Sequence, residues 1–411
     1  MATIVGGKGT FSKRAAPPLP CGAAAHSLAL SIPCLALLEL CLTYPFLVLA
    51  AHDASFALSR VEIGRPAPGP DDVAIALKYC GMCHSDLHTI NGEWGVNKYP
   101  IAVGHELAGI VTEVGANVSK FKVGDEIAVG CMVHSCMECS MCKQDLENHC
   151  MSMIQTYSSA FPKGADHDDC AETWTNGGYS TGITVHSRFC YTVPKGMKLE
   201  HAGPLCCAGV TTYAPLARWT KGKKDQTVGV VGLGGLGMMA VKLAVAMGAK
   251  VTVFSRSLSK KAEAAALGAE IVAYTDADEM GKLFRTFDHI VNTVAQVHDI
   301  NAIISTLKAH TGIMTMLGGV PTPYSVAAFP MIFSGTRIEG SLIGGAKVTQ
   351  EMLEFCAEHN VTPDVQIIHA RDAEASLKAM NAGTAGVIRN VIDISTIADI
   401  AEYVAPAEAK A

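Results

Sequence analysis

The sequence predicts an α/β fold that combines a doubly wound parallel sheet domain with a second, β-rich domain. Between about residues 50 and 210, short runs rich in Val, Ile and Gly alternate apolar with polar residues and end at turn residues, as β-strands do. From Thr227 onward, strand-like and helical segments alternate. This alternation is typical of a parallel sheet with helices on both faces.

The length, charge and cysteine content narrow the class of protein. A chain of 411 residues is long enough for two domains with separate cores. The net charge of −6 and the lack of a basic run argue against binding to nucleic acid. Of the 15 cysteines, six lie in two tight groups, which indicates metal binding more than a disulfide framework. We therefore expect a reducing, cytoplasmic location.

The first 49 residues follow neither domain pattern. Residues 28–51 are apolar and long enough to cross a bilayer, but Pro33, Glu39 and Pro45 are unfavourable in a spanning helix. Basic residues before this stretch and small residues after it suit a segment that targets the protein to an organelle. Untranslated sequence read through in a gene model and a membrane anchor are the alternatives. We set residues 1–49 aside as an N-terminal extension and expect no other membrane contact.

A glycine-rich turn joins the first strand of the parallel sheet to the following helix. In a GxGxxG turn, the first glycine permits the tight bend and the second lets the backbone approach a pyrophosphate. The third glycine lets the helix pack on the strand, and the helix N-terminus offers N–H groups to the phosphate. We therefore predict a dinucleotide site that includes Gly232, Leu233, Gly234, Gly235, Leu236 and Gly237.

The end of the next strand indicates which dinucleotide is bound. A site for NAD has Asp or Glu here, to accept a hydrogen bond from the ribose 2′-hydroxyl. This strand ends instead in Ser255, Arg256 and Ser257, with Lys260 and Lys261 close behind. No carboxylate would repel a 2′-phosphate, and the cations could pair with it. We therefore expect NADP(H) rather than NAD(H).

Four cysteines stand close together in the polar segment of residues 134–150. Cys136, Cys139, Cys142 and Cys150 are separated by two, two and seven residues. Short gaps of this kind let consecutive thiolates reach one zinc ion, and four thiolates leave no open coordination position. The segment therefore predicts a structural zinc lobe, and the chemistry lies elsewhere.

Several motifs carry a resemblance to a known family. The segment GHELAGIVTEVGANV (residues 104–118) is similar to the zinc alcohol dehydrogenase signature. CGMCHSDLH, the four-cysteine lobe, PLCCAGVTTYAPL and VGLGGLG resemble the cinnamyl alcohol dehydrogenase branch of the medium-chain dehydrogenase/reductase superfamily. The resemblance covers about residues 50–395. It implies a GroES-like catalytic domain (50–207 and 346–411, with the zinc lobe at 134–150), a Rossmann NADP-binding domain (208–345) and a homodimer.

The resemblance also implies the roles of particular residues. A catalytic zinc would be held by Cys83, His105 and Cys207, with Glu106 beside it as an alternate ligand or a neighbour of the ligands. Ser85 and His88 would relay the hydroxyl proton of the substrate. Gln155 replaces a Trp of the lignin-forming plant members, which predicts a smaller and more polar wall of the substrate site.

The expected activity is the interconversion of primary alcohols and aldehydes by hydride transfer with NADP(H). Two zinc ions per chain would take part, one catalytic and one structural, and the partner would be a small-molecule alcohol or aldehyde of the cinnamyl type or a broader range. A polyol or secondary-alcohol dehydrogenase is one alternative. A non-catalytic NADP-binding protein is another, although the complete set of ligand-type residues argues against it.

Overall fold

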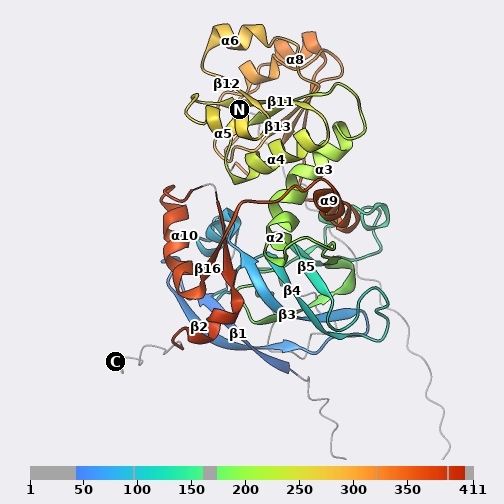
Figure 1. Cartoon of the computed structure of the whole chain (residues 1–411), viewed down its shortest axis with the longest axis vertical. Helices are drawn as coiled ribbons and strands as arrows, with labels where there is room; N and C mark the ends of the chain where they lie inside the picture. The colour runs from blue at the N-terminus through green and yellow to red at the C-terminus, as the bar shows by residue number, and fades with distance from the viewer. Residues whose placement is uncertain (1–42, 96–97, 161–173, 321, 387, 403–411) are drawn as a thin grey trace, which may run out of the picture. The chain divides into compact units, whose positions relative to one another are not determined.

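The computed structural model describes residues 43–95, 98–160, 174–320, 322–386 and 388–402 (Figure 1). Residues 41–411 form one unit by their internal contacts, and this unit contains a parallel sheet and a largely antiparallel sheet. Among the described residues, no helix has the length and apolar character needed to span a membrane.

The parallel sheet has six strands in the spatial order β12-β11-β10-β13-β14-β15. Every neighbouring pair is parallel, and the order is that of a doubly wound dinucleotide-binding sheet, as predicted. The two central strands are almost wholly buried, which fits the apolar run TVGVV of β10. The strands are β10 (Thr227–Val231), β11 (Lys250–Ser255), β12 (Glu270–Ala273), β13 (His289–Asn292), β14 (Ile313–Met316) and β15 (Arg337–Gly340).

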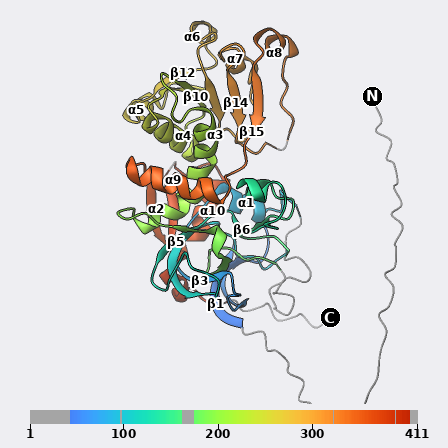
Figure 2. The same cartoon turned by 90° about the vertical axis from the view of Figure 1, so that its right-hand side faces the viewer.

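Helices connect the strands of this sheet. In Figure 2, α4 and α5 lie towards the β12 edge, and α7 and α8 lie beside β14 and β15. The helices are α3 (Val210–Trp219), α4 (Gly235–Ala246), α5 (Lys261–Ala266), α6 (Ala277–Lys282), α7 (Asn301–Ile304) and α8 (Ala328–Ser334). Strand order reverses between β10 and β13, and the crevice at such a switch point is where doubly wound sheets bind their ligands.

The second sheet has seven strands built around β3 (Asp72–Gly81). Strand β17 pairs antiparallel with β3, so the chain returns to this sheet after the parallel sheet. Strand β3 therefore lies between β17 and β4, because it pairs with β17 along one edge and with β4 along the other. The other strands are β4 (Glu106–Val114), β5 (Glu126–Val129), β8 (Gly182–His186), β9 (Cys190–Thr192), β16 (Val365–His369) and β17 (Arg389–Asp393).

Smaller elements complete the β-rich part. Strand β1 (Thr43–Ala51) pairs antiparallel with β2 (Leu58–Pro66), so residues 43–49 of the segment set aside as an N-terminal extension belong to the fold. Residues 1–42 of that extension lie outside the described residues. The remaining pieces are β6 (Met132–His134), β7 (Ile154–Gln155), α1 (His84–Ile90), α2 (Leu199–Pro204), α9 (Ala346–Glu358) and α10 (Ala373–Asn381).

Helix α2 packs closely on the start of β4. A side chain at Gly203 would place its Cβ 2.2 Å from the carbonyl oxygen of Glu106, so only glycine allows this approach. After Pro204 the helix widens into the π-helical turn η4 (Leu205–Gly209), which carries Cys207. The close contact therefore sets the position of Cys207 relative to the start of β4.

We predict that Gly203→Ala destabilises the protein by about 1–3 kcal/mol, because the added methyl must push α2 away from β4. Gly281→Ala is the matched control, since a Cβ at Gly281 in α6 meets nothing within 4 Å. That substitution should leave stability unchanged or raise it by about 0.5–1 kcal/mol. Urea unfolding of the two variants measures both effects. Equal stabilities would show that α2 and β4 do not depend on this contact.

Candidate active site

Three sequence-distant residues bring metal-ligating atoms together at the end of the second sheet. Cys83 precedes α1, His105 precedes β4 and Cys207 lies in η4. The Sγ atoms of Cys83 and Cys207 are 3.9 Å apart, and His105 Nε2 lies 3.2 Å from Cys207 Sγ. Zn–S bonds of about 2.3 Å in a tetrahedral site place two sulfurs roughly 3.8 Å apart. The observed spacing therefore fits zinc.

Asp86 holds two of these residues in place. Its carboxylate is fully buried and accepts hydrogen bonds from the backbone N–H groups of Cys83 (2.8 Å) and Gly104 (3.2 Å). It also lies 3.5 Å from His105 Nδ1, which forms a 2.8 Å hydrogen bond with the hydroxyl of Tyr157. Partners on Nδ1 leave Nε2 as the metal-ligating nitrogen, an arrangement usual for zinc-binding histidines.

Glu106 is buried beside the same cluster. Its carboxylate lies within 4.8 Å of the other ligand atoms, and neither oxygen has a hydrogen-bond partner among the described residues. Burial raises the pKa of Glu106 to about 7, against the opposing effect of the Arg389 guanidinium, whose Nε lies 3.4 Å from Glu106 Oε2. A buried carboxylate without hydrogen bonds is suited to a nearby cation.

The four cysteines of the zinc lobe also converge. Sγ distances are 3.9 Å between Cys136 and Cys142, 3.6 Å between Cys139 and Cys142, and 3.4 Å between Cys136 and Cys150. These distances are close to the sulfur–sulfur distance in a tetrahedral zinc–thiolate site. They are far from the S–S bond length of a disulfide, which is roughly 2.05 Å. Hydrogen bonds from the backbone N–H groups of Glu138 and Cys139 lower the pKa of Cys136 to about 6. The spacing of the four sulfur atoms therefore fits one zinc ion bound by all four cysteines.

The glycine turn has the shape that a dinucleotide needs. Gly232 has a positive φ of 88°, and a Cβ on Gly237 would lie 2.2 Å from the carbonyl oxygen of Gly232. A Cβ on Gly234 would meet nothing within 4 Å, so this glycine faces open space at the N-terminus of α4. The first glycine thus permits the tight turn, and the third permits the close approach of the helix to the turn. The second leaves room for a phosphate.

The residues predicted to choose between NADP and NAD lie where β11 ends. Ser255 is the last residue of this strand, and Arg256 and Ser257 follow it on the exposed surface. The ammonium of Lys260 donates a 2.7 Å hydrogen bond to the carbonyl oxygen of Leu233 in the glycine turn. This end of β11 is joined to the turn, because Gly232 N–H donates to the carbonyl oxygen of Phe254 (2.9 Å).

A cavity of about 1510 Å³ is lined both by two of the predicted metal-ligating residues and by the glycine turn. It is lined by Cys83 and Cys207, by the turn that follows β10, and by residues 293–295 after β13. Ser85 and His88 of α1 also line it, and the thiol of Cys83 lies 3.6 Å from Ser85 Oγ. A ligand in this cavity can therefore reach the metal-ligating atoms and the dinucleotide turn at once.

His88 is held by two neighbours from the following turn. Its Nδ1 forms a 2.6 Å hydrogen bond with Glu93 Oε2, and its ring stacks on Trp94 with centroids 4.8 Å apart. The hydrogen bond from His88 lowers the pKa of Glu93. Since a carboxylate accepts, His88 Nδ1 donates and Nε2 is left as the proton acceptor.

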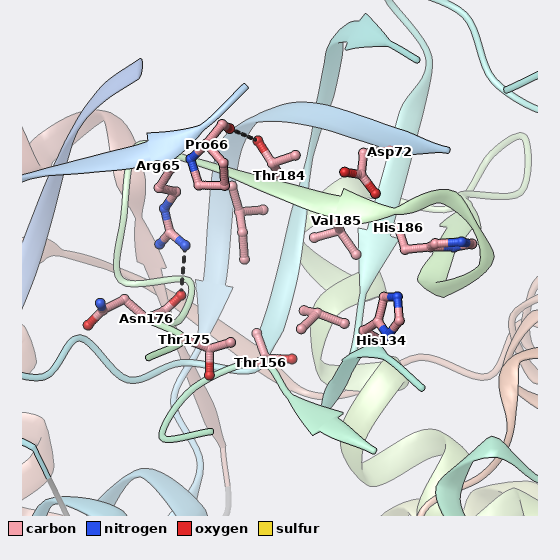
Figure 3. A pocket seen from close by; sticks show the side chains of 12 residues that line it. Arg65, Pro66, Asp72, His134, Thr156, Thr175, Asn176, Thr184, Val185 and His186 are labelled. Carbon is pink, nitrogen blue, oxygen red and sulfur yellow. Dashed lines mark hydrogen bonds between the residues drawn. The ribbon is translucent and has the colours of Figure 1, made fainter. Parts of the chain in front are cut away.

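A second, small cavity of about 40 Å³ lies between β2, β8 and the zinc lobe (Figure 3). Arg65 points across it and donates to the carbonyl oxygens of Asn176 and Gly177, each at 2.9 Å. His134 and His186 form one wall, with their ring centroids 5.5 Å apart. The space holds little more than a water molecule, so it is not a substrate site.

Sequence reasoning missed several residues of the site. Asp86 and Glu93 stand close to Ser85 and His88 in the sequence, and their acidic side chains were a usable signal. Tyr157 and Arg389 carried no such signal, because only the fold brings them to His105 and Glu106. Cys131 was also overlooked, and it lines the cavity together with Cys83 and Cys207.

Comparisons with known proteins agree with the geometry. The alcohol dehydrogenase GroES-like domain family matches residues 69–195, and the zinc-binding dehydrogenase family matches residues 235–358. The chain is 47% identical over 321 residues to an 8-hydroxygeraniol dehydrogenase of Catharanthus roseus, covering 78% of this chain and 87% of that protein. It is 44% identical over 352 residues to the aldehyde reductase YahK of Escherichia coli, covering 85% and 98%.

Among solved structures, the chain is similar to the cinnamyl alcohol dehydrogenase of Helicobacter pylori, determined in complex with NADP(H). The TM-score is 0.76 at 36% sequence identity, and the match covers 86% of this chain and 99% of that one. The chain belongs to the zinc-dependent alcohol dehydrogenases of the medium-chain dehydrogenase/reductase superfamily, in the cinnamyl alcohol dehydrogenase branch.

Proposed function

We propose that this alcohol dehydrogenase works as an NADPH-dependent aldehyde reductase on cinnamyl-type and other medium-sized primary aldehydes. The observation that supports this most directly is the shared cavity, in which Cys83 and Cys207 face the same space as the glycine turn. The named activity of the aldehyde reductase from Escherichia coli points to the same substrate class and direction.

Cys83, His105 and Cys207 would hold the catalytic zinc, and Glu106 would stand beside them as an alternate ligand. When bound, zinc polarises the substrate oxygen as a Lewis acid, and NADPH supplies the hydride. Asp86 orients His105 and fixes the backbone of Cys83. Glu106 would offset the charge of the site from its buried position beside Arg389.

Ser85 and His88 would move the proton that the product oxygen needs. Ser85 Oγ lies beside Cys83, so its hydroxyl can donate to an oxygen near the ligands. His88 also lines the cavity, and its Nδ1 bond to Glu93 leaves Nε2 free of a proton in the neutral ring. For reduction, Nε2 would first take up a proton from solvent, and Ser85 would donate its hydroxyl proton to the product oxygen and be reprotonated from the side of His88.

The remaining walls of the cavity support a substrate of medium size. Trp94, Leu342 and Ile343 are apolar residues of the lining, and Gln155 is one of several polar ones. A flat or unbranched apolar chain of medium size can pack against the three apolar residues.

The experiment that tests this proposal follows NADPH oxidation over a panel of aldehydes and NADP⁺ reduction by sorbitol. We expect reduction of cinnamaldehyde to be faster than oxidation of sorbitol, NADPH to be preferred to NADH, and turnover to stop after removal of zinc by a chelator. Faster oxidation of sorbitol would instead favour a polyol dehydrogenase. A lack of turnover with every compound would favour a non-catalytic NADP-binding protein.

The two zinc sites should respond differently to loss of one ligand. Cys207→Ala should lower kcat/KM by at least about 100-fold, since even the outer partners of zinc ligands are worth about 10–100-fold. It should leave the structural ion and most of the stability in place. Cys139→Ala should instead lower the melting temperature by roughly 5 °C or more and remove the structural ion. Metal analysis, calorimetry and kinetics on both variants would contradict this division if both lost only activity.

We predict that Arg256→Ala raises KM for NADPH by about tenfold, because a charge-assisted contact with the 2′-phosphate is lost. KM for NADH should stay unchanged. Lys250→Ala is the matched control, since Lys250 is an exposed cation at the opposite end of β11. An equal effect of both variants on NADPH would point to general electrostatic attraction and not to a phosphate site.

We also propose a homodimer that forms through the parallel sheet. Strand β15 ends the sheet order, and α8 beside it exposes Phe329, Ile332 and Phe333 by 72%, 74% and 76%. An apolar surface of this kind next to an edge strand suits a second copy of the chain. Phe333→Glu should convert the dimer into a monomer in size-exclusion chromatography with light scattering. A wild-type monomer at micromolar concentration would contradict the proposal.

A cytoplasmic location is proposed on the basis of the cysteines. The eleven cysteines in the described part of the chain are all free thiols, which suits a reducing compartment. Microscopy of a chain with a C-terminal fluorescent tag tests this, since import into an organelle would mean that residues 1–49 act as a targeting segment.

A further inference from the structure

The loop between β15 and α9 forms part of the wall of the active-site cavity. Ser341, Leu342 and Ile343 line the cavity, and Leu342 keeps 49% of its surface exposed. Ile343 has a positive φ of 36°, a conformation that a β-branched residue rarely adopts. Such backbone persists only where the surroundings hold it in place. The question is therefore what holds this loop.

Two consecutive residues of the zinc lobe form hydrogen bonds with the backbone of this loop from outside the cavity. Asn148 Nδ2 donates a 2.7 Å hydrogen bond to the carbonyl oxygen of Leu342. Glu147 Oε2 accepts a 3.0 Å hydrogen bond from the backbone N–H of Ala346, the first residue of α9. Asn148 is 5% exposed and Glu147 is fully buried, so water does not compete for these bonds.

The backbone of the loop after β15 lies in close contact with the zinc lobe. A Cβ on Gly345 would lie 2.0 Å from the carbonyl oxygen of Asp145 and 2.6 Å from Glu147 Oε2, so the loop backbone packs directly on the lobe. The other oxygen of Glu147 accepts from Arg188 Nε at 2.6 Å, which compensates the buried charge.

Glu147 and Asn148 also lie next to the four-cysteine cluster. Glu147 and Asn148 lie in the short 3₁₀ helix η2 (Glu147–His149), directly before the fourth cysteine. The backbone N–H of Cys150 donates to the carbonyl oxygen of Glu147 at 3.0 Å. A shift of Cys150 would therefore also move Glu147 and Asn148.

We propose that the four-cysteine lobe sets the shape of the substrate wall, with Asn148 and Glu147 as positioning residues for Leu342 and Ile343. The lobe would then stabilise its own segment of the chain and also position the loop that forms one wall of the active-site cavity. Neither Asn148 nor Glu147 lines the cavity, so both act through the loop. The inference rests on the proposed function for its kinetic readout, and a second readout is independent of activity.

The first experiment compares Asn148→Ala and Asn148→Asp with the wild-type enzyme. Both variants lose the amide donor, and the second keeps the size of the side chain. We expect kcat/KM for cinnamaldehyde to fall about fivefold, in the range that one hydrogen bond supplies, through a higher KM. Turnover of acetaldehyde, a two-carbon aldehyde with little surface to contact Leu342, and KM for NADPH should change less than about twofold. Lys143→Ala, an exposed position in the same lobe, is the control.

A double-mutant cycle with Leu342→Ala separates positioning from general stability. If Asn148 acts through the loop, its substitution should have little further effect on the cinnamaldehyde-to-acetaldehyde ratio once Leu342 is truncated. Additive effects on this ratio would overturn the inference. So would a variant that lowers the melting temperature but leaves the ratio unchanged.

Hydrogen–deuterium exchange of the amides of residues 341–346 gives the readout that needs no substrate. We expect faster exchange in Asn148→Ala than in the wild type and in Lys143→Ala, with the other peptides of the parallel sheet unchanged. Unchanged exchange in this loop would overturn the inference even if the enzyme reduces aldehydes. Faster exchange in an enzyme that reduces no aldehyde would keep the positioning role and reject the proposed function.

Discussion

The close packing of α2 on β4 is the constraint on which the rest of the site depends. It brings Cys207 from the π-helical turn to His105, which lies about a hundred residues earlier in the sequence. Gly203 permits this approach because a side chain would meet the carbonyl oxygen of Glu106. Asp86 then completes the arrangement by binding both the backbone of Cys83 and the ring of His105. Two soft sulfurs and one imidazole nitrogen thus meet in a buried, preorganised cluster suited to zinc.

The position of this cluster gives it a chemical use. The glycine turn lies at the point where the strand order of the parallel sheet reverses, and the same cavity contains Cys83 and Cys207. A cofactor held at the N-terminus of α4 would therefore share this cavity with the sulfur atoms of Cys83 and Cys207. His88 is oriented by Glu93 and lies on the wall of the same cavity. Its imidazole ring can therefore exchange a proton with a molecule inside the cavity.

The two cysteine clusters share one structural principle but differ in their surroundings. In the zinc lobe, four sulfurs surround one point and leave no position for a substrate. In the second group, Cys83 and Cys207 line an open cavity, and the buried His105 and Glu106 lie behind them. The hydrogen bond from Asn148 to Leu342 connects the two regions, so the closed site bears on the shape of the open one.

The sequence by itself determined the parallel sheet, the glycine turn and the zinc lobe, because each is encoded by residues that are near neighbours. Strand–helix alternation, GxGxxG and the spacing of Cys136 to Cys150 are local patterns with a direct physical meaning. The proposed catalytic ligands were predicted only through resemblance, since no spacing rule links Cys83 to Cys207. Tertiary structure alone decided the rest: Arg389 reaches Glu106 because β17 returns to β3, and Leu342 reaches Asn148 because a loop of the parallel sheet packs on a distant lobe. Contacts between segments so far apart depend on how whole elements pack, which no local pattern records.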